Sequence, residues 1–550
     1  MKNRYLDVME RALDAYSTEH IDRYFEDVKR TGLTEHGFPR LTANIGTMLA
    51  YGRRADLGSR FIAMMDFCCA HVSTDRAAND FSIQEMIACI DLLEERGAVS
   101  KDKLEEWRAL LKKPIIYNEV AKSADQLAYN WVLFSCVSEF LRMKRGLCPM
   151  DMDFIDMQIA TQVVHLDENA MYRDAAIHPP MVYDNVPRTL FSILLFYGYD
   201  GKYRELIDNS LRQAGLLTLK MQSTSGEIPY GGRSNQFYHN EAHLAAIAEF
   251  EARRYAKEGN IELAARFKRA ASDALSSIER GFALTPIHHV KNRFPLDTQY
   301  GCEGYAYFDK YMITAASFLN WARIFCDETV PVSEPLTDND AFELSKDFHK
   351  LFLRSGDYFA EIDTDADPHY DASGLGRVHK RGAPSEICLS CPGTATPNFV
   401  IDREDACDFA FSAGVISGGE PIFKTFGEYR IVSTSSDASG ARARLVCYVE
   451  GGELFFDVSV SPCGVGLRVS GEGEVALMLP VFMSDGDVKS LIEESEGIVE
   501  VKYRGYVCRY SSSGKICDTG RMGCNRNGHY ALFSAVGEGM VEVDISIEKT

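Results

Sequence analysis

The apolar residues of this chain change their spacing once, and the change divides the sequence into two parts. From residue 1 to about residue 327 they recur at i, i+3, i+4 and i+7, which places them on one face of an α-helix. From residue 357 onward they alternate with polar residues, as in strands that bury one face. This order predicts a helical part followed by an antiparallel β part.

Six segments show the helical spacing most clearly: 83–95, 126–144, 188–195, 203–219, 242–257 and 261–282. Polar or glycine-bearing loops separate them, and about ten to twelve helices joined as hairpins fit this span. No fixed-period sequence repeat is present, so the pairing of helices is structural. After a proline-bearing linker we predict one more helix at residues 340–353.

Eight runs alternate with period two: 358–362, 408–416, 429–433, 444–449, 453–460, 474–482, 498–510 and 529–547. Many short strands with glycine-rich turns predict an antiparallel β-sandwich. We therefore predict a helical domain at residues 1–330, a linker with a helix at 331–356, and a sandwich at 357–550.

Composition limits the class of protein. Hydrophobic residues make up 46% and charged residues 25% of the 550 residues, which is typical of globular chains. The net charge of −21 argues against nucleic acid or an anionic membrane as partner. No apolar run has membrane-spanning length, and the first ten residues lack a secretory pattern, so we expect a cytoplasmic location.

Cysteine use predicts reduced thiols. The fifteen cysteines are odd in number and most stand in apolar segments, as core residues do. The spacing of Cys388 and Cys391 is the one zinc-like pattern, and a lone C-x-x-C is weak evidence for a metal. No H-E-x-x-H spacing, P-loop or dinucleotide fingerprint is present, so we expect no metal and no cofactor.

One polar stretch, residues 225–241, carries most of the groups that can transfer protons, and it runs into a strong helix former. A polar, glycine-broken loop before a buried helix is typical of a functional site. The alternative is a capped interhelical loop whose polar groups bind only backbone. The candidate residues are Glu227, Glu241, His239, Tyr238, Arg233, Asn235 and Asn240.

Four further polar loops compete for the same site: 118–131, 171–188, 291–311 and 369–381. For several of their residues a structural role is the alternative: an N-cap for Asp184, core packing for Tyr305, Tyr311 and Trp131, and a solvated loop around His379. Their candidate residues are Arg173, His178, Asp184, Arg293, Glu303, Tyr307 and His379.

Helical hairpins followed by a sandwich resemble carbohydrate-active enzymes that have an (α/α) toroid and a C-terminal β-sandwich. These include heparinase II/III-like and chondroitin-type polysaccharide lyases and the glycoside hydrolases on the same toroid. The loop 226–237, Gly-Glu-Ile-Pro-Tyr-Gly-Gly-Arg-Ser-Asn-Gln-Phe, looks most like the β-glucuronidases of glycoside hydrolase family 154. The lyases usually have an Asp-Gly-Ser-Phe/Tyr loop and a Gln-His pair at the comparable place, and this chain departs from that pattern.

The resemblance implies a fold of the (α/α)6 type and a uronate-containing oligosaccharide as substrate. The carboxylate of a uronate needs a cation, and Arg233, Arg173 and Arg293 are candidates. Hydrolysis needs two carboxyl groups across the glycosidic bond. We expect Glu227 and Glu303 to form this pair, with Glu241 next.

Two alternatives stay open. A lyase needs a base for the C5 proton and a group that neutralises the sugar carboxylate; Asn240, His239, Tyr238 and Arg233 could serve, with Tyr307 as the acid. A glycan-binding protein without activity would need aromatic and amide side chains but no acids. For the enzyme we expect an anionic oligosaccharide partner, and the chain could also form a homo-oligomer.

Overall fold

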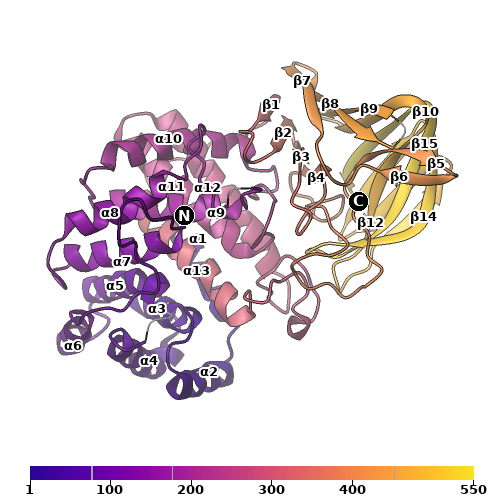
Figure 1. The fold of residues 1–550 in the computed structure, drawn as a ribbon. Coiled ribbons are helices and arrows are strands. Elements are labelled where there is room, and N and C mark those ends of the chain that lie inside the picture. The colour runs from indigo at the N-terminus through magenta and orange to yellow at the C-terminus, as the bar shows by residue number, and fades with distance from the viewer. Residues whose placement is uncertain (76–78, 176, 451) are drawn as a thin grey trace.

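The structure is a computed structural model, and it describes residues 1–75, 79–175, 177–450 and 452–550. Its helical part precedes its β part along the chain (Figure 1). Thirteen α-helices occur in the described residues: α1 (Lys2–Leu13), α2 (Thr18–Thr31), α3 (Gly37–Ala50), α4 (Gly58–His71), α5 (Asn79–Arg96), α6 (Lys101–Leu111), α7 (Trp131–Lys144), α8 (Met152–Val163), α9 (Val182–Phe196), α10 (Arg204–Met221), α11 (Tyr238–Lys257), α12 (Ile261–Phe282) and α13 (Phe308–Phe325). Within those residues no helix is both long enough and apolar enough to cross a membrane.

Six of these helices form a closed inner ring. Helices α3, α5, α7, α9, α11 and α13 contact one another in this order, and α13 also contacts α3. The others pack outside this ring: α2 and α4 on α3, α6 on α4, α8 on α7, α10 on α9, α12 on α11 and α1 on α13. Every residue of α11 from 238 to 252 is buried, as expected for a helix surrounded by neighbours. The predicted (α/α)6-type toroid is confirmed.

The β part consists of two antiparallel sheets. The smaller has the order β1-β2-β3-β4, and the larger has eleven strands around the long pair β10 and β15. The strands are β1 (Asp340–Glu343), β2 (Lys350–Ser355), β3 (Tyr358–Asp363), β4 (Gly374–Lys380), β5 (Ala413–Ser417), β6 (Glu420–Phe423), β7 (Arg430–Asp437), β8 (Gly440–Val449), β9 (Gly452–Ser461), β10 (Gly464–Ser484), β11 (Leu491–Ser495), β12 (Ile498–Tyr503), β13 (Tyr506–Ser512), β14 (Lys515–Cys524) and β15 (His529–Lys549).

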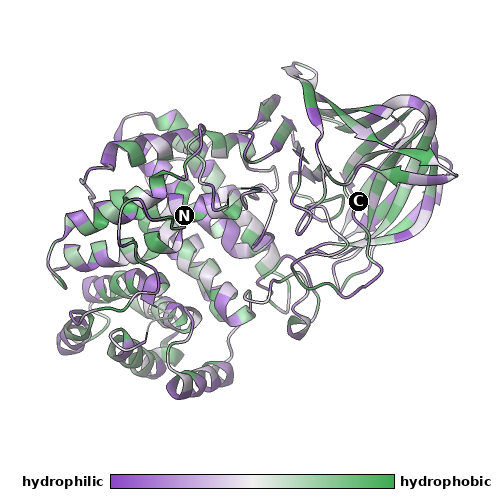
Figure 2. Ribbon diagram, viewed as in Figure 1, coloured by the Kyte–Doolittle hydropathy of each residue, from purple (hydrophilic) through white to green (hydrophobic). Residues whose placement is uncertain are grey.

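The small sheet lies between the toroid and the large sheet (Figure 1). On one face Leu351 and Leu353 share a core with residues of β8, β9, β10 and β15. On the other face Phe352 and Phe359 pack against Met181 of the toroid. Both faces are therefore buried, whereas β9 alternates buried and less buried residues, which Figure 2 shows as alternating hydropathy along the large sheet. The predicted sandwich is confirmed, with the toroid adding a third layer.

Several local predictions are wrong. Residues 340–353 form β1 and the first part of β2, not a helix. The polar loop expected at 369–381 contains the buried strand β4. Helix α9 begins at Val182, so Asp184 lies in its first turn and not at its N-cap. Helix α11 begins at Tyr238, which places His239 and Glu241 on a helix instead of a loop.

Candidate functional site

A cavity of about 700 Å³ lies inside the ring, where the six inner helices begin. Each of these helices contributes lining residues close to its first residue, and the segments that precede α3, α7, α9, α11 and α13 add more. The N-terminal ends of helices carry partial positive charge, so their convergence favours an anionic ligand. The lining includes His36, Arg40, Phe81, Asn130, Trp131, Asp174, Tyr183, Arg233, His239, His243, Tyr305, Lys310, Tyr311 and Phe318.

Three tyrosines gather at one wall of this cavity. The Ser234 hydroxyl lies 3.0 Å from the hydroxyl of Tyr183 and 3.0 Å from that of Tyr305. The Tyr311 ring centroid lies 6.2 Å from that of Tyr305. Burial raises the pKa of Tyr183 and of Tyr311. These hydroxyls are thus held protonated at neutral pH, as proton donors must be.

His239 lies beside this wall and is 6% exposed. Its ring meets the ring of Tyr311 edge to face, with centroids 4.8 Å apart. Its Nδ1 has no hydrogen-bond partner among the described residues. Burial, helped by the charge of Arg40, lowers the pKa of His239 to about 3, so its imidazole is neutral and can accept a proton.

Three cations border the cavity. Arg233 forms an ion pair with Asp174 and lies over the Tyr183 ring, 4.7 Å from its centroid. Arg40 is buried and pairs with Glu85 at 2.9 Å. Lys310 has no ion-pair partner within the part of the chain that the structure describes, and burial lowers its pKa. Lys310 is therefore the cation available to a ligand.

The carboxylates of the cavity wall already have partners. Asp174 accepts from Asn130 at 2.5 Å and pairs with Arg233. Glu35 accepts from Tyr24 and, at 2.6 Å, from the backbone N–H of Gly37. The wall therefore offers tyrosine, histidine and cationic groups more readily than free acids.

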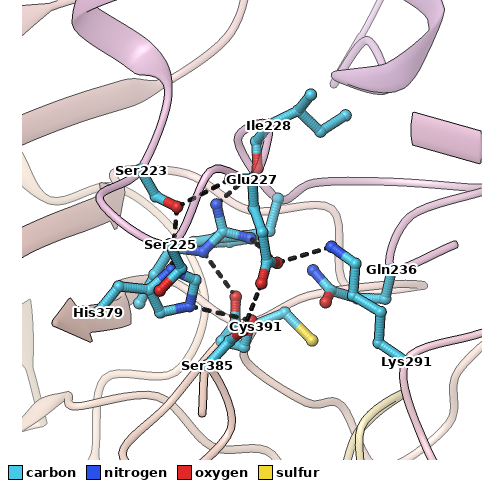
Figure 3. A network of polar contacts seen from close by, with 12 residues as sticks. Ser223, Ser225, Glu227, Ile228, Gln236, Lys291, His379, Ser385 and Cys391 are labelled. Carbon is cyan, nitrogen blue, oxygen red and sulfur yellow. Dashed lines mark hydrogen bonds and ion pairs between the residues drawn. The ribbon is translucent and has the colours of Figure 1, made fainter. Parts of the chain in front are cut away.

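Glu227, the first predicted acid, lies outside the ring cavity, in a buried network between the toroid and β4 (Figure 3). It accepts from Lys291 Nζ at 2.7 Å and from the Ser385 hydroxyl. Burial opposes its ionisation, but the charges of Lys291 and Arg377 outweigh burial and hold the pKa of Glu227 well below its usual range. It is a carboxylate, not a proton donor.

Glu241 shares the same lysine, at 3.0 Å. It also accepts from the backbone N–H of Ile228 at 3.3 Å. Burial and the nearby Glu227 charge raise its pKa, against the effect of Lys291. Both acids therefore help to hold in place the loop that carries Arg233 and Ser234.

Glu303, the expected partner of Glu227, belongs to a different buried group. Arg526, from the turn between β14 and β15, binds its two oxygens at 2.6 and 3.1 Å. The backbone N–H of Ser234 donates to Glu303 Oε1 at 2.6 Å. Ser234 has a φ of 59°, a conformation that costs free energy and persists only where its surroundings fix it. Among the described residues, Glu227 and Glu303, which we expected to act together, share no hydrogen-bond or ion-pair partner.

Other predicted residues lie around the cavity without lining it. Asn235 donates to the Pro229 carbonyl, and Asn240 donates to the Ser234 carbonyl at 3.2 Å. Tyr238 packs against Phe282. Tyr307 is 46% exposed at the start of α13 and does not line the cavity. Tyr311, one turn later, lines the cavity wall where we expected Tyr307.

The remaining predicted residues have structural partners. Arg173 pairs with Asp347 at 3.0 Å, and His178 lies beside His349. Asp184 pairs with Arg188 at 2.9 Å. These residues are not brought to the cavity wall, and neither are Arg293 and His379: the first binds the Gly281 carbonyl at 2.7 Å and the second contacts the hydroxyls of Ser223 and Ser390.

The sequence reasoning missed His36, Arg40, His243 and Lys310. A signal was present: His36 and Arg40 are four residues apart, as are His239 and His243, and this spacing places both members of each pair on one helix face. The first pair lies some 200 residues before the second in the sequence. The two pairs line one cavity because α13 contacts both α3 and α11 and so closes the ring.

One group of metal-ligand type occurs in the described residues, beside the toroid loop that carries Phe294 and Tyr300. Asp402, Cys524 and His529 bring their ligand atoms within 4.8 Å of one another. His529 Nε2 lies 2.8 Å from Asp402 Oδ1, and burial raises the pKa of the Cys524 thiol to about 11.

No family model matches the chain, and no curated protein matches it. Among solved structures, a Streptomyces coelicolor A3 chondroitin AC lyase mutant is 12% identical, covering 99% of this chain and 79% of its own, with a TM-score of 0.49. Heparinase III is 10% identical over 94% and 78%, with a TM-score of 0.45. A glycosyl hydrolase of family 88 from Bacteroides vulgatus is 10% identical over 59% and 99%, with a TM-score of 0.38.

Proposed function

We propose that this chain is a lyase that cleaves uronate-containing oligosaccharides by β-elimination in the ring cavity. The observation that carries the proposal is the pairing of a neutral, unpartnered His239 with the protonated Tyr311 at 4.8 Å between ring centroids. A base and an acid side by side are what elimination requires. The helix N-termini and Lys310 favour a ligand with a carboxylate.

Each group has a defined task in this scheme. A ring nitrogen of the neutral His239 takes the C5 proton, next to the sugar carboxylate, and the electron pair forms the double bond between C4 and C5. The bond from C4 to the glycosidic oxygen breaks, and the Tyr311 hydroxyl gives its proton to that oxygen. Lys310 and Arg233 stabilise the negative charge that builds up on the carboxylate while C5 loses its proton.

Paired-carboxylate hydrolysis, as in a family 154 β-glucuronidase, is less well supported by the contacts. Glu227 and Glu303 lie in separate ion-paired groups. Asp174 and Glu35 of the cavity wall each accept hydrogen bonds from protein groups. A hydrolase would need one of these acids to be released by the substrate.

Incubation with uronate oligosaccharides separates the possible activities. A lyase makes an unsaturated uronate, which absorbs in the ultraviolet, together with a new reducing end. We expect this band with the parent chain, and a decrease in rate of about 10²- to 10⁴-fold in His239→Gln and in Tyr311→Phe. Tyr307→Phe and His178→Gln are matched controls outside the cavity wall and should keep the parental rate.

Reducing sugar without the ultraviolet band would reject elimination in favour of hydrolysis. Neither product, with saturable binding of the oligosaccharide, would reject an enzyme in favour of a glycan-binding protein. Equal loss of rate in Tyr307→Phe and Tyr311→Phe would remove the assignment of the acid.

A further inference from the structure

A second, smaller cavity of about 210 Å³ lies between the toroid and the β part. The end of α12 and the segment after it form one side, and the turns after β4, β10 and β12 form the other. It is distinct from the ring cavity, and it adjoins the buried network of Glu227 (Figure 3). Its charged lining residues are Glu227, Arg280, Lys291, Arg293, Glu386, Asp485 and Arg504.

Two of the four cations in this lining are neutralised within the protein. Lys291 pairs with Glu227 and Glu241. Arg504 forms an ion pair with Asp485 at 2.5 Å. These five groups satisfy one another and leave their carboxylates unavailable to the remaining cations.

The other two cations have no carboxylate partner in the described residues. Arg293 is 9% exposed, and it donates to the carbonyls of Gly281 and Pro286 and to the Tyr238 hydroxyl. Arg280 donates to the Ser225 carbonyl at 2.5 Å. For Arg293 the burial of a guanidinium without a counter-charge is costly, because carbonyl dipoles replace only part of its hydration.

The remaining acid of the lining does not supply that counter-charge. Glu386 accepts from the Tyr503 hydroxyl at 2.8 Å. Burial raises the pKa of Glu386, which favours its neutral form. The cavity therefore has an excess of positive charge in a protein whose net charge is −21.

We infer that this cavity binds a small oxyanion, held between Arg280 and Arg293. The planar guanidinium groups suit a carboxylate, a sulfate or a phosphate, each of which can accept two parallel N–H bonds. The hydroxyl of Ser277 and the Tyr506 side chain line the same space. Because the arginines belong to the toroid and Ser385 and Arg504 to the β part, a bound oxyanion links the two parts. This site is separate from the proposed lyase activity and does not depend on it.

Calorimetric titration of the full chain at fixed ionic strength in chloride tests the site. Sulfate, phosphate and acetate are the probes. We expect saturable binding of at least one of them, at one site per chain, and a weakening of about 10- to 100-fold in Arg280→Gln. Arg280 is exposed, so this variant should fold. Arg30→Gln, on α2, removes another exposed arginine far from the cavity lining and should bind like the parent.

The probes also separate the sources of the ligand. Binding of sulfate or phosphate alone points to a free tetrahedral anion, and binding of acetate alone points to the carboxylate of an organic acid or sugar. Arg293→Lys keeps the charge and loses the planar donor pair, so it should also bind more weakly. The absence of saturable binding at millimolar probe, or binding that Arg280→Gln leaves unchanged, overturns the inference.

Discussion

Burial alone does not decide the role of an ionisable residue in this protein. His239 and Glu227 are both almost fully buried. Cationic neighbours reinforce burial in one case and oppose it in the other: Arg40 helps to keep His239 neutral, while Lys291 keeps Glu227 charged. The same kind of positive neighbour therefore keeps a buried histidine neutral and a buried carboxyl group ionised, because the charged form of the first is a cation and that of the second is an anion.

The lowered pKa of His239 predicts an unusual acid limit for activity. The base must be neutral, and its pKa of about 3 means that protonation begins only well below neutral pH. We expect kcat/KM to be retained as the pH falls through about 6.5, the ordinary histidine value. A pH profile of kcat/KM, with circular dichroism recorded in parallel, checks this. A loss of half the rate near the ordinary value in a folded sample would contradict it.

At the scale of elements, the segment before α11 is held in a strained shape. Gly226, Gly231, Gly232, Ser234 and Gln236 all have positive φ. Gly226 also lies against α12, since a Cβ built there would be 2.1 Å from the Asp273 carbonyl oxygen. The strain is maintained by close packing on a neighbouring helix, which places Ser234 at the tyrosines.

Gly226→Ala should therefore destabilise the protein more than an alanine at a free helix end. Gly259, after α11, has a φ of 82° and no atom near its Cβ position, and it serves as the control. We expect Gly259→Ala to lower the free energy of unfolding by about 1 kcal/mol. For Gly226→Ala the loss in the free energy of unfolding should exceed this by about 1–3 kcal/mol. Urea unfolding measures both, and equal losses would show that the contact with α12 relaxes freely.

At the scale of the whole molecule, the β part reaches into the toroid and fixes its loop. Arg526 lies in the turn between β14 and β15, yet it binds Glu303 and the Gly301 carbonyl of the toroid. Through Glu303 it holds the Ser234 N–H, and Ser234 contacts Tyr183 and Tyr305. The cavity wall therefore depends on a residue that follows it by almost 300 positions in the sequence.

Arg526→Gln should leave Glu303 buried without its cation. Breaking a buried ion pair in this way costs about 3–5 kcal/mol. We expect a loss of this size in the free energy of unfolding, and a lower kcat, because Ser234 and the tyrosines lose their support. Arg403→Gln, which breaks the exposed pair with Asp405, should cost about 0–1 kcal/mol. Urea unfolding and turnover of the oligosaccharide test both variants; similar losses in the two would contradict a buried, coupled pair.

The sequence by itself determined the architecture. A change of apolar period from helical to alternating is a local property, and burial of one face per element follows from it. Its limit was reached at residues 340–353, where both faces of β2 are buried. The apolar residues Ala341, Leu344, Phe348 and Leu351 follow one another at intervals of three or four, which is helical spacing, so only packing between the toroid and the large sheet decided that the segment is extended.

The tertiary structure decided which polar groups form the site. Residues 225–241 are crowded in sequence, but their side chains point in different directions: His239 into the ring cavity, Glu227 and Glu241 to Lys291, and Asn240 to the backbone. His36, Lys310 and Tyr311 meet His239 only because the ring closes between α3 and α13. Ion pairs and cavities join residues that are distant along the chain, and no local pattern encodes the partner that a buried charge finds.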